Sequence, residues 1–120
     1  MTHNCIVKSL YDYPGVIADL EEDLLIDTEA RKEAEENLAY WLAEQELAIA
    51  VDSEYRNEAM RKAAKVKLQQ ESPKYYELNQ EVTRLTLREK RSQIRLDRHK
   101  REFSVLKLER KMAIAVAEQV

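Results

Sequence analysis

The chain has 120 residues, of which 44% are hydrophobic and 36% are charged, and it contains one Gly and two Pro. This length is enough for one domain but too short for most multi-domain enzymes. Because tight turns, hairpins and phosphate-binding loops are built from Gly and Pro, their near absence argues against all-β folds, Rossmann units and P-loops. The composition predicts an all-α protein made of long helices with narrow apolar stripes.

The net charge of −3 hides an uneven distribution of charge along the chain. Residues 1–58 contain 15 acids and 4 bases, whereas residues 84–111 contain 11 bases and 4 acids. This division predicts either an acidic helix that lies beside a basic one or a basic surface for an acidic partner.

The first 15 residues are predicted to form an N-terminal arm that is separate from the helices. Tyr13-Pro14-Gly15 is the first strong break, because Pro fixes its own φ and is followed by the only Gly. Cys5 is the only cysteine, so no intrachain disulfide is expected, and a reducing, cytoplasmic location fits. We expect neither a secretory leader nor a membrane span, because no apolar run approaches the required length.

A first long helix is predicted over about residues 16–70, which contain neither Gly nor Pro. A second helix is predicted over about residues 74–118, after a turn at 71–73. Ser72 is a natural N-cap, and Pro73 suits the first helical position, where its missing N–H costs nothing. The short connection predicts an antiparallel two-helix hairpin, in which Leu42 lies near Phe103 and the acidic stretch lies beside the basic one.

Apolar residues recur at spacings of three and four along both predicted helices, which is typical of coiled-coil packing. The residues that we expect to pack between the helices, called the seam below, are Leu20, Leu24, Leu38, Trp41, Leu42, Phe103 and Leu106. Two helices alone leave other apolar residues uncovered. We therefore expect a homodimer in which two hairpins form a four-helix bundle, with the stretch 17–26 as a candidate contact.

The sequence offers little support for catalysis or metal binding, so we expect no enzyme activity and no cofactor. His3 and Cys5 are two ligands at most, and His99 lacks the Glu-x-x-His spacing of di-iron bundles. Glu33 and Glu36 match half of the magnesium motif of helical pyrophosphohydrolases, but no Glu-x-x-Asp completes it. Carboxylates at this spacing are common on the solvated face of an acidic helix.

A basic stripe on the second helix is the main alternative to a purely structural role. Its members recur at intervals of four and three and so share one helix face: Arg84, Arg88, Arg91, Arg95 and Arg98. Such a stripe either pairs with acids of the first helix or follows a phosphate backbone. No aromatic residues interrupt it, although single-strand binding would need them for stacking.

Three blocks of the sequence carry a resemblance. They are Tyr55-Arg-Asn-Glu-Ala-Met-Arg-Lys-Ala-Ala64, Glu71-Ser-Pro-Lys-Tyr-Tyr-Glu-Leu78 and Arg101-Glu-Phe-Ser-Val-Leu-Lys-Leu108. Together they resemble small helical-hairpin proteins of bacteriophages that have no characterised activity. The resemblance implies a phage or prophage accessory protein, and it brings no catalytic residues. The sequence therefore predicts a non-enzymatic interaction or scaffold protein, with a nucleic-acid-associated accessory protein as the alternative.

Overall fold

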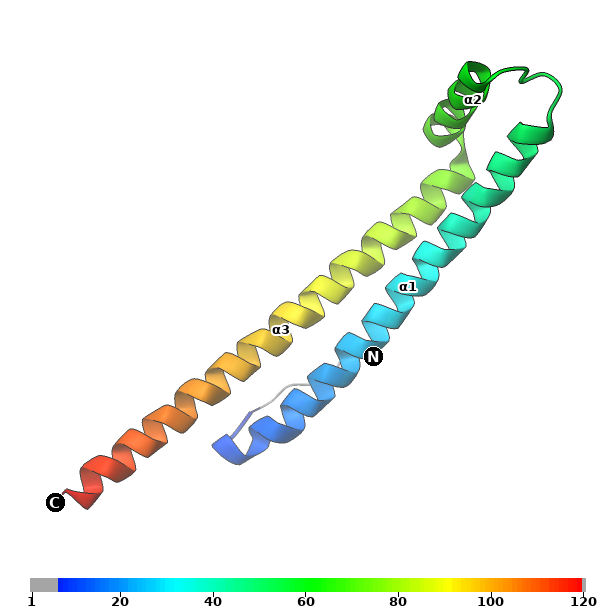
Figure 1. The fold of residues 1–120 in the computed structure, drawn as a ribbon. Coiled ribbons are helices and arrows are strands. Elements are labelled where there is room, and N and C mark those ends of the chain that lie inside the picture. Colours follow the sequence, from blue (N-terminus) through cyan, green and yellow to red (C-terminus); the bar gives the residue numbers. More distant parts are fainter. Residues whose placement is uncertain (1–6, 120) are drawn as a thin grey trace. The chain divides into compact units, whose positions relative to one another are not determined.

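The computed structural model describes residues 7–119, and all of its regular structure is helical (Figure 1). A short 3-10 helix, Leu10–Asp12, leads into α1 (Tyr13–Val51), which is followed by α2 (Glu58–Glu71) and α3 (Pro73–Glu118). The predicted all-α class is therefore confirmed, but the chain forms three helices where the sequence predicted two. Within the described range, no helix is long and apolar enough to cross a membrane.

The first helix starts earlier than predicted, at Tyr13. Pro14 lies in its first turn, where a backbone N–H has no partner within the helix, so Pro14 does not break the helix. Just upstream, the Asp12 carboxylate accepts hydrogen bonds from the backbone N–H groups of Lys8 and Ser9, each at 2.9 Å. These bonds hold the backbone that leads into α1. The last residues of the predicted arm, which spans residues 1–15, therefore belong to this turn and to the start of α1.

The helix predicted over residues 16–70 is in fact two helices, α1 and α2, joined by a short loop. In this loop the Asp52 carboxylate accepts a hydrogen bond from the backbone N–H of Glu54 at 2.9 Å. The Asn57 side chain accepts one from the N–H of Met60, also at 2.9 Å, and so caps α2. Asp and Asn side chains that bond nearby N–H groups compete with helical bonding, which explains a break without Gly or Pro.

The chain folds back in this loop, so that α2 lies beside the end of α1 (Figure 1). Lys65 Nζ of α2 lies 3.6 Å from Glu46 Oε1 of α1. Nearer the loop, Ala50 of α1 and Glu58 of α2 line one groove. The reversal that we predicted at residues 71–73 therefore lies about 20 residues earlier, because capping side chains end α1 and restart the helix there.

Ser72 and Pro73 begin α3 in the way that the sequence predicted, but they do not reverse the chain. The Ser72 hydroxyl accepts a hydrogen bond from the backbone N–H of Tyr75 at 3.3 Å, and Pro73 occupies the first helical position. The ring of Tyr75 lies 6.3 Å from that of Trp41 on α1. The start of α3 thus continues along α1 in the same sense as α2.

The chain divides into two compact units. The first unit combines the chain up to Thr28 with the chain from Arg88 onward, and the second unit spans Glu29–Leu87. In the first unit, Tyr13, Leu20 and Leu96 are the buried apolar residues among those described. In the second unit, Ala34 and Leu85 have this role.

Within the first unit, α1 and α3 run antiparallel. The rings of Tyr13 and Phe103 are stacked, with centroids 5.3 Å apart and planes 10° apart. Further along the same pair of helices, Asp27 contacts Arg88. The predicted pairing of Phe103 with Leu42 is therefore wrong, because the earlier reversal shifts the register between the two helices.

Candidate functional site

The predicted seam residues are divided between the two units. Leu20 is buried, Leu24 and Phe103 are half-buried, and Leu106 is exposed in the first unit. The other three seam residues, Leu38, Trp41 and Leu42, are half-buried in the second unit. The structure therefore does not gather the seven residues into one apolar site.

The first unit instead contains a buried polar layer, which we define as Asp23, Asp27, Arg88 and Ser92. Asp23 and Asp27 are 4% and 6% exposed, although an isolated carboxylate is strongly destabilised when it leaves water. Arg88 Nε lies 3.0 Å from Asp27 Oδ1. Ser92 Oγ donates a hydrogen bond to Asp27 Oδ2, so each oxygen of the Asp27 carboxylate has a partner on α3.

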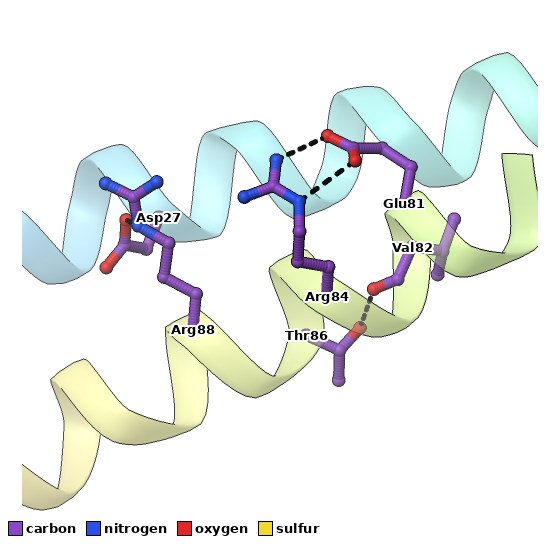
Figure 2. A network of polar contacts seen from close by, with 6 residues as sticks. All are labelled: Asp27, Glu81, Val82, Arg84, Thr86 and Arg88. Atoms are coloured by element: carbon purple, nitrogen blue, oxygen red, sulfur yellow. Dashed lines mark hydrogen bonds and ion pairs between the residues drawn. The ribbon is translucent and has the colours of Figure 1, made fainter. Parts of the chain in front are cut away.

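Burial of the polar layer is uneven, because the side chain of Asp27 is 8% exposed whereas that of Arg88 is 45% exposed. Arg88 reaches from α3 to Asp27 on α1 (Figure 2), and nearly half of its side-chain surface remains accessible to water. The buried Asp27 carboxylate therefore has a positively charged partner, although the Arg88 side chain is not itself fully buried. The polar layer therefore links α1 to α3 in the observed register, in which both oxygens of the Asp27 carboxylate have partners.

Asp23 and Asp27 were not predicted from the sequence to lie at the interface of the two helices. They follow Leu20 at i+3 and i+7, which places them on the same helix face as that buried leucine. On α3, Arg88 and Ser92 follow the buried Leu85 at the same spacings. Polar residues at core positions of both helices were the signal that could have identified the layer.

A small aromatic cluster lies at the other end of the first unit. The Tyr13 hydroxyl donates a hydrogen bond to Glu102 Oε2 at 3.4 Å, and the Tyr13 ring lies 6.5 Å from that of His99. Burial raises the pKa of the Tyr13 phenol above its ordinary value, and the negative charge of Glu102 raises it further. His99 Nδ1 lies 2.8 Å from the backbone carbonyl oxygen of Arg95, which gives this ring a local partner on α3 itself.

The five arginines of the basic stripe differ in their contacts. Figure 2 shows Arg88 reaching to Asp27 on α1, while Arg84 turns to Glu81 on its own helix. The Arg84 guanidinium forms two hydrogen bonds to that carboxylate, at 2.7 and 3.0 Å, and they lower the pKa of Glu81. Because Arg88 pairs with Asp27 and Arg84 pairs with Glu81, less of their positive charge is available to bind a phosphate backbone.

The remaining stripe residues differ in exposure. Arg95 is half-buried and engaged in an interaction, whereas Arg91 and Arg98 are exposed. No described residue forms an ion pair or a hydrogen bond with the Arg91 or Arg98 side chain. These two are therefore exposed stripe arginines without an acidic partner among the described residues.

The described residues offer no constellation for metal chemistry, since residues 7–119 contain no group of three His, Cys, Asp or Glu that could hold a metal ion. Glu33 and Glu36, which match half of a magnesium motif, are both exposed. His3 and Cys5 lie outside the described residues. A groove of about 460 Å³ between the end of α1 and α2 is lined by residues such as Ile49, Tyr55 and Lys67, and it is open to solvent.

Comparison with known proteins identifies no relative of this chain. No protein family, curated protein or solved structure matches the chain.

Proposed function

We propose that the protein is a non-enzymatic helical interaction protein that works as a self-associating scaffold. The observation that carries this proposal is the imbalance between buried and exposed apolar side chains. Among the described residues, five apolar residues are buried while 17 large ones are exposed, from Tyr11 to Val116. A soluble protein that exposes so many apolar side chains on its helices has surfaces that suit protein partners.

The polar layer gives such a scaffold a defined surface. Because Asp27 is bonded to Arg88 and to Ser92, α1 and α3 of the first unit are held in one register. A fixed register keeps the exposed side chains of both helices at constant spacings. The resemblance to phage helical-hairpin proteins adds a phage or prophage accessory role to the proposal, and the single cysteine, Cys5, adds a reducing, cytoplasmic setting.

Chemical cross-linking of the wild-type protein at increasing concentration tests this function. We expect a cross-linked dimer that grows with concentration and is lost when the protein is denatured first. Cross-linking that yields only the monomer at every concentration would overturn self-association.

Nucleic-acid binding is the second candidate, and the exposed Arg91 and Arg98 favour it. They are seven residues apart and lie two turns apart on one face of α3. Two cations provide only a weak, salt-sensitive contact with a phosphate backbone. The scaffold proposal therefore has the stronger support.

A further inference from the structure

The end of α3 contains an apolar segment that is exposed in the described chain. Every residue from Ser104 to Gln119 is exposed. Met112–Ala117 is a run of six apolar residues, so it is apolar on all sides of the helix. A helix of this kind is normally buried against another element.

One stripe of this segment points away from α1. Phe103 faces Tyr13 on α1, and Val105 follows two positions later, about 200° around the helix. Leu108, Met112 and Val116 continue the stripe at spacings of three and four. These four side chains, which we call the outer stripe, are 53%, 58%, 60% and 62% exposed in chain order.

We propose that the outer stripe pairs with the same stripe of a second copy, with the two α3 helices antiparallel and the two-fold axis near Met112. This inference rests on the proposed self-association and names the surface that mediates it. A two-fold interface requires that residue i contact residue j whenever j contacts i. The spacing of Leu108, Met112 and Val116 meets this requirement, because an axis at Met112 brings Leu108 of each copy opposite Val116 of the other.

The distribution of charge favours a second copy at this segment over the earlier part of α3. Residues 84–104 contain 8 bases and 3 acids, so two copies of that stretch would repel each other. Residues 105–118 contain 3 bases and 2 acids, so repulsion there is small.

The size of the contact sets its strength. About four turns of helix from each chain bury less than the roughly 1,600 Å² of a standard interface. We therefore expect reversible association with a dissociation constant on the order of micromolar. The rest of the exposed apolar surface stays available to other partners of the scaffold.

Substitution of Leu108→Glu tests the surface, with Leu47→Glu on α1 as the matched control. Both leucines are largely exposed, at 58% and 65%, so neither change should unfold the chain. Sedimentation velocity should show at least a tenfold weaker dimer for Leu108→Glu and an unchanged dimer for Leu47→Glu. If Leu108→Glu dimerises like the wild type, pairing through the outer stripe is overturned while self-association stands. If the wild type is monomeric, both proposals are overturned.

Cysteine cross-linking in a Cys5→Ser background tests the direction of pairing. Met112→Cys should form an intermolecular disulfide on mild oxidation, because the two-fold axis brings the two Cβ atoms close together. Leu108→Cys alone should not, since the two copies of position 108 lie about 12 Å apart along the helix axis. A mixture of Leu108→Cys and Val116→Cys should form the heterodimer. Efficient Leu108→Cys homodimers would instead show a parallel arrangement and overturn the proposal.

Discussion

Asp27 on α1 and Arg88 on α3 form an ion pair in which the aspartate side chain is buried and the arginine side chain remains nearly half exposed. The pair links residues that are far apart in sequence. Ser92 donates a hydrogen bond to the other oxygen of the Asp27 carboxylate. A buried ion pair contributes little net stability compared with apolar packing, but loss of one partner is costly. Its main effect is therefore to select the register of the two helices.

Arg88→Ala should destabilise the protein by about 1–3 kcal/mol, because a buried carboxylate loses its charged partner. The value is below that for a fully buried pair, since Arg88 is partly solvated and Ser92 still donates to Asp27. Urea unfolding followed by circular dichroism measures the change. The control is Arg91→Ala on the same helix, which should shift the free energy of unfolding by less than about 0.5 kcal/mol. Equal effects of the two substitutions would show that the ion pair does not hold the helices.

Tyr13→Phe should remove part of the stability loss at alkaline pH. The folded state raises the pKa of the Tyr13 phenol, so the unfolded chain releases this proton first as the pH rises. The stabilising effect is complete below about pH 10, the ordinary tyrosine value, and is lost as the pH rises through the folded-state pKa. Urea unfolding at neutral pH and above pH 10 measures the difference. Tyr76→Phe, at an exposed position, should keep the wild-type pH dependence.

Asn57→Ala should destabilise α2 by about 1 kcal/mol, because the N–H of Met60 loses its capping acceptor. Asn57→Asp should preserve the cap and most of the stability. Amide hydrogen exchange of residues 58–62 reports the local effect. Unchanged protection in the Asn57→Ala protein would contradict the role assigned to this residue at the chain reversal.

The nucleic-acid alternative makes a distinct prediction for Arg91 and Arg98. Fluorescence anisotropy with a labelled duplex should show binding that weakens steeply between about 50 and about 200 mM salt if these arginines contact phosphates. Arg91→Glu with Arg98→Glu would then abolish the signal. The scaffold proposal predicts no salt-sensitive binding by the wild type, so such binding would favour the alternative.

The sequence was a good guide to helix content and to the start of α3. The near absence of Gly and Pro predicted an all-α chain, and Ser72-Pro73 correctly marked a helix start, because capping and proline geometry are local properties. The reversal between α1 and α2 was missed because it is made by Asp52 and Asn57, whose side chains compete with helical bonding without a Gly or Pro signal.

The interface of the first unit was harder to predict for a different reason. Tyr13 contacts Phe103 and Asp27 contacts Arg88 only because the chain turns back near residue 52, so the misplaced turn changed every expected pair. Asp23 and Asp27 were not predicted to be buried, because buried acids are uncommon. Their burial depends on partners supplied by α3, which local sequence patterns do not contain.

The most direct test of the account is sedimentation equilibrium of the wild-type protein over a wide range of concentrations. The account predicts an average mass that rises from the monomer value of 14.1 kDa toward twice that value, as expected for reversible self-association. A mass that stays at 14.1 kDa at all concentrations would contradict it.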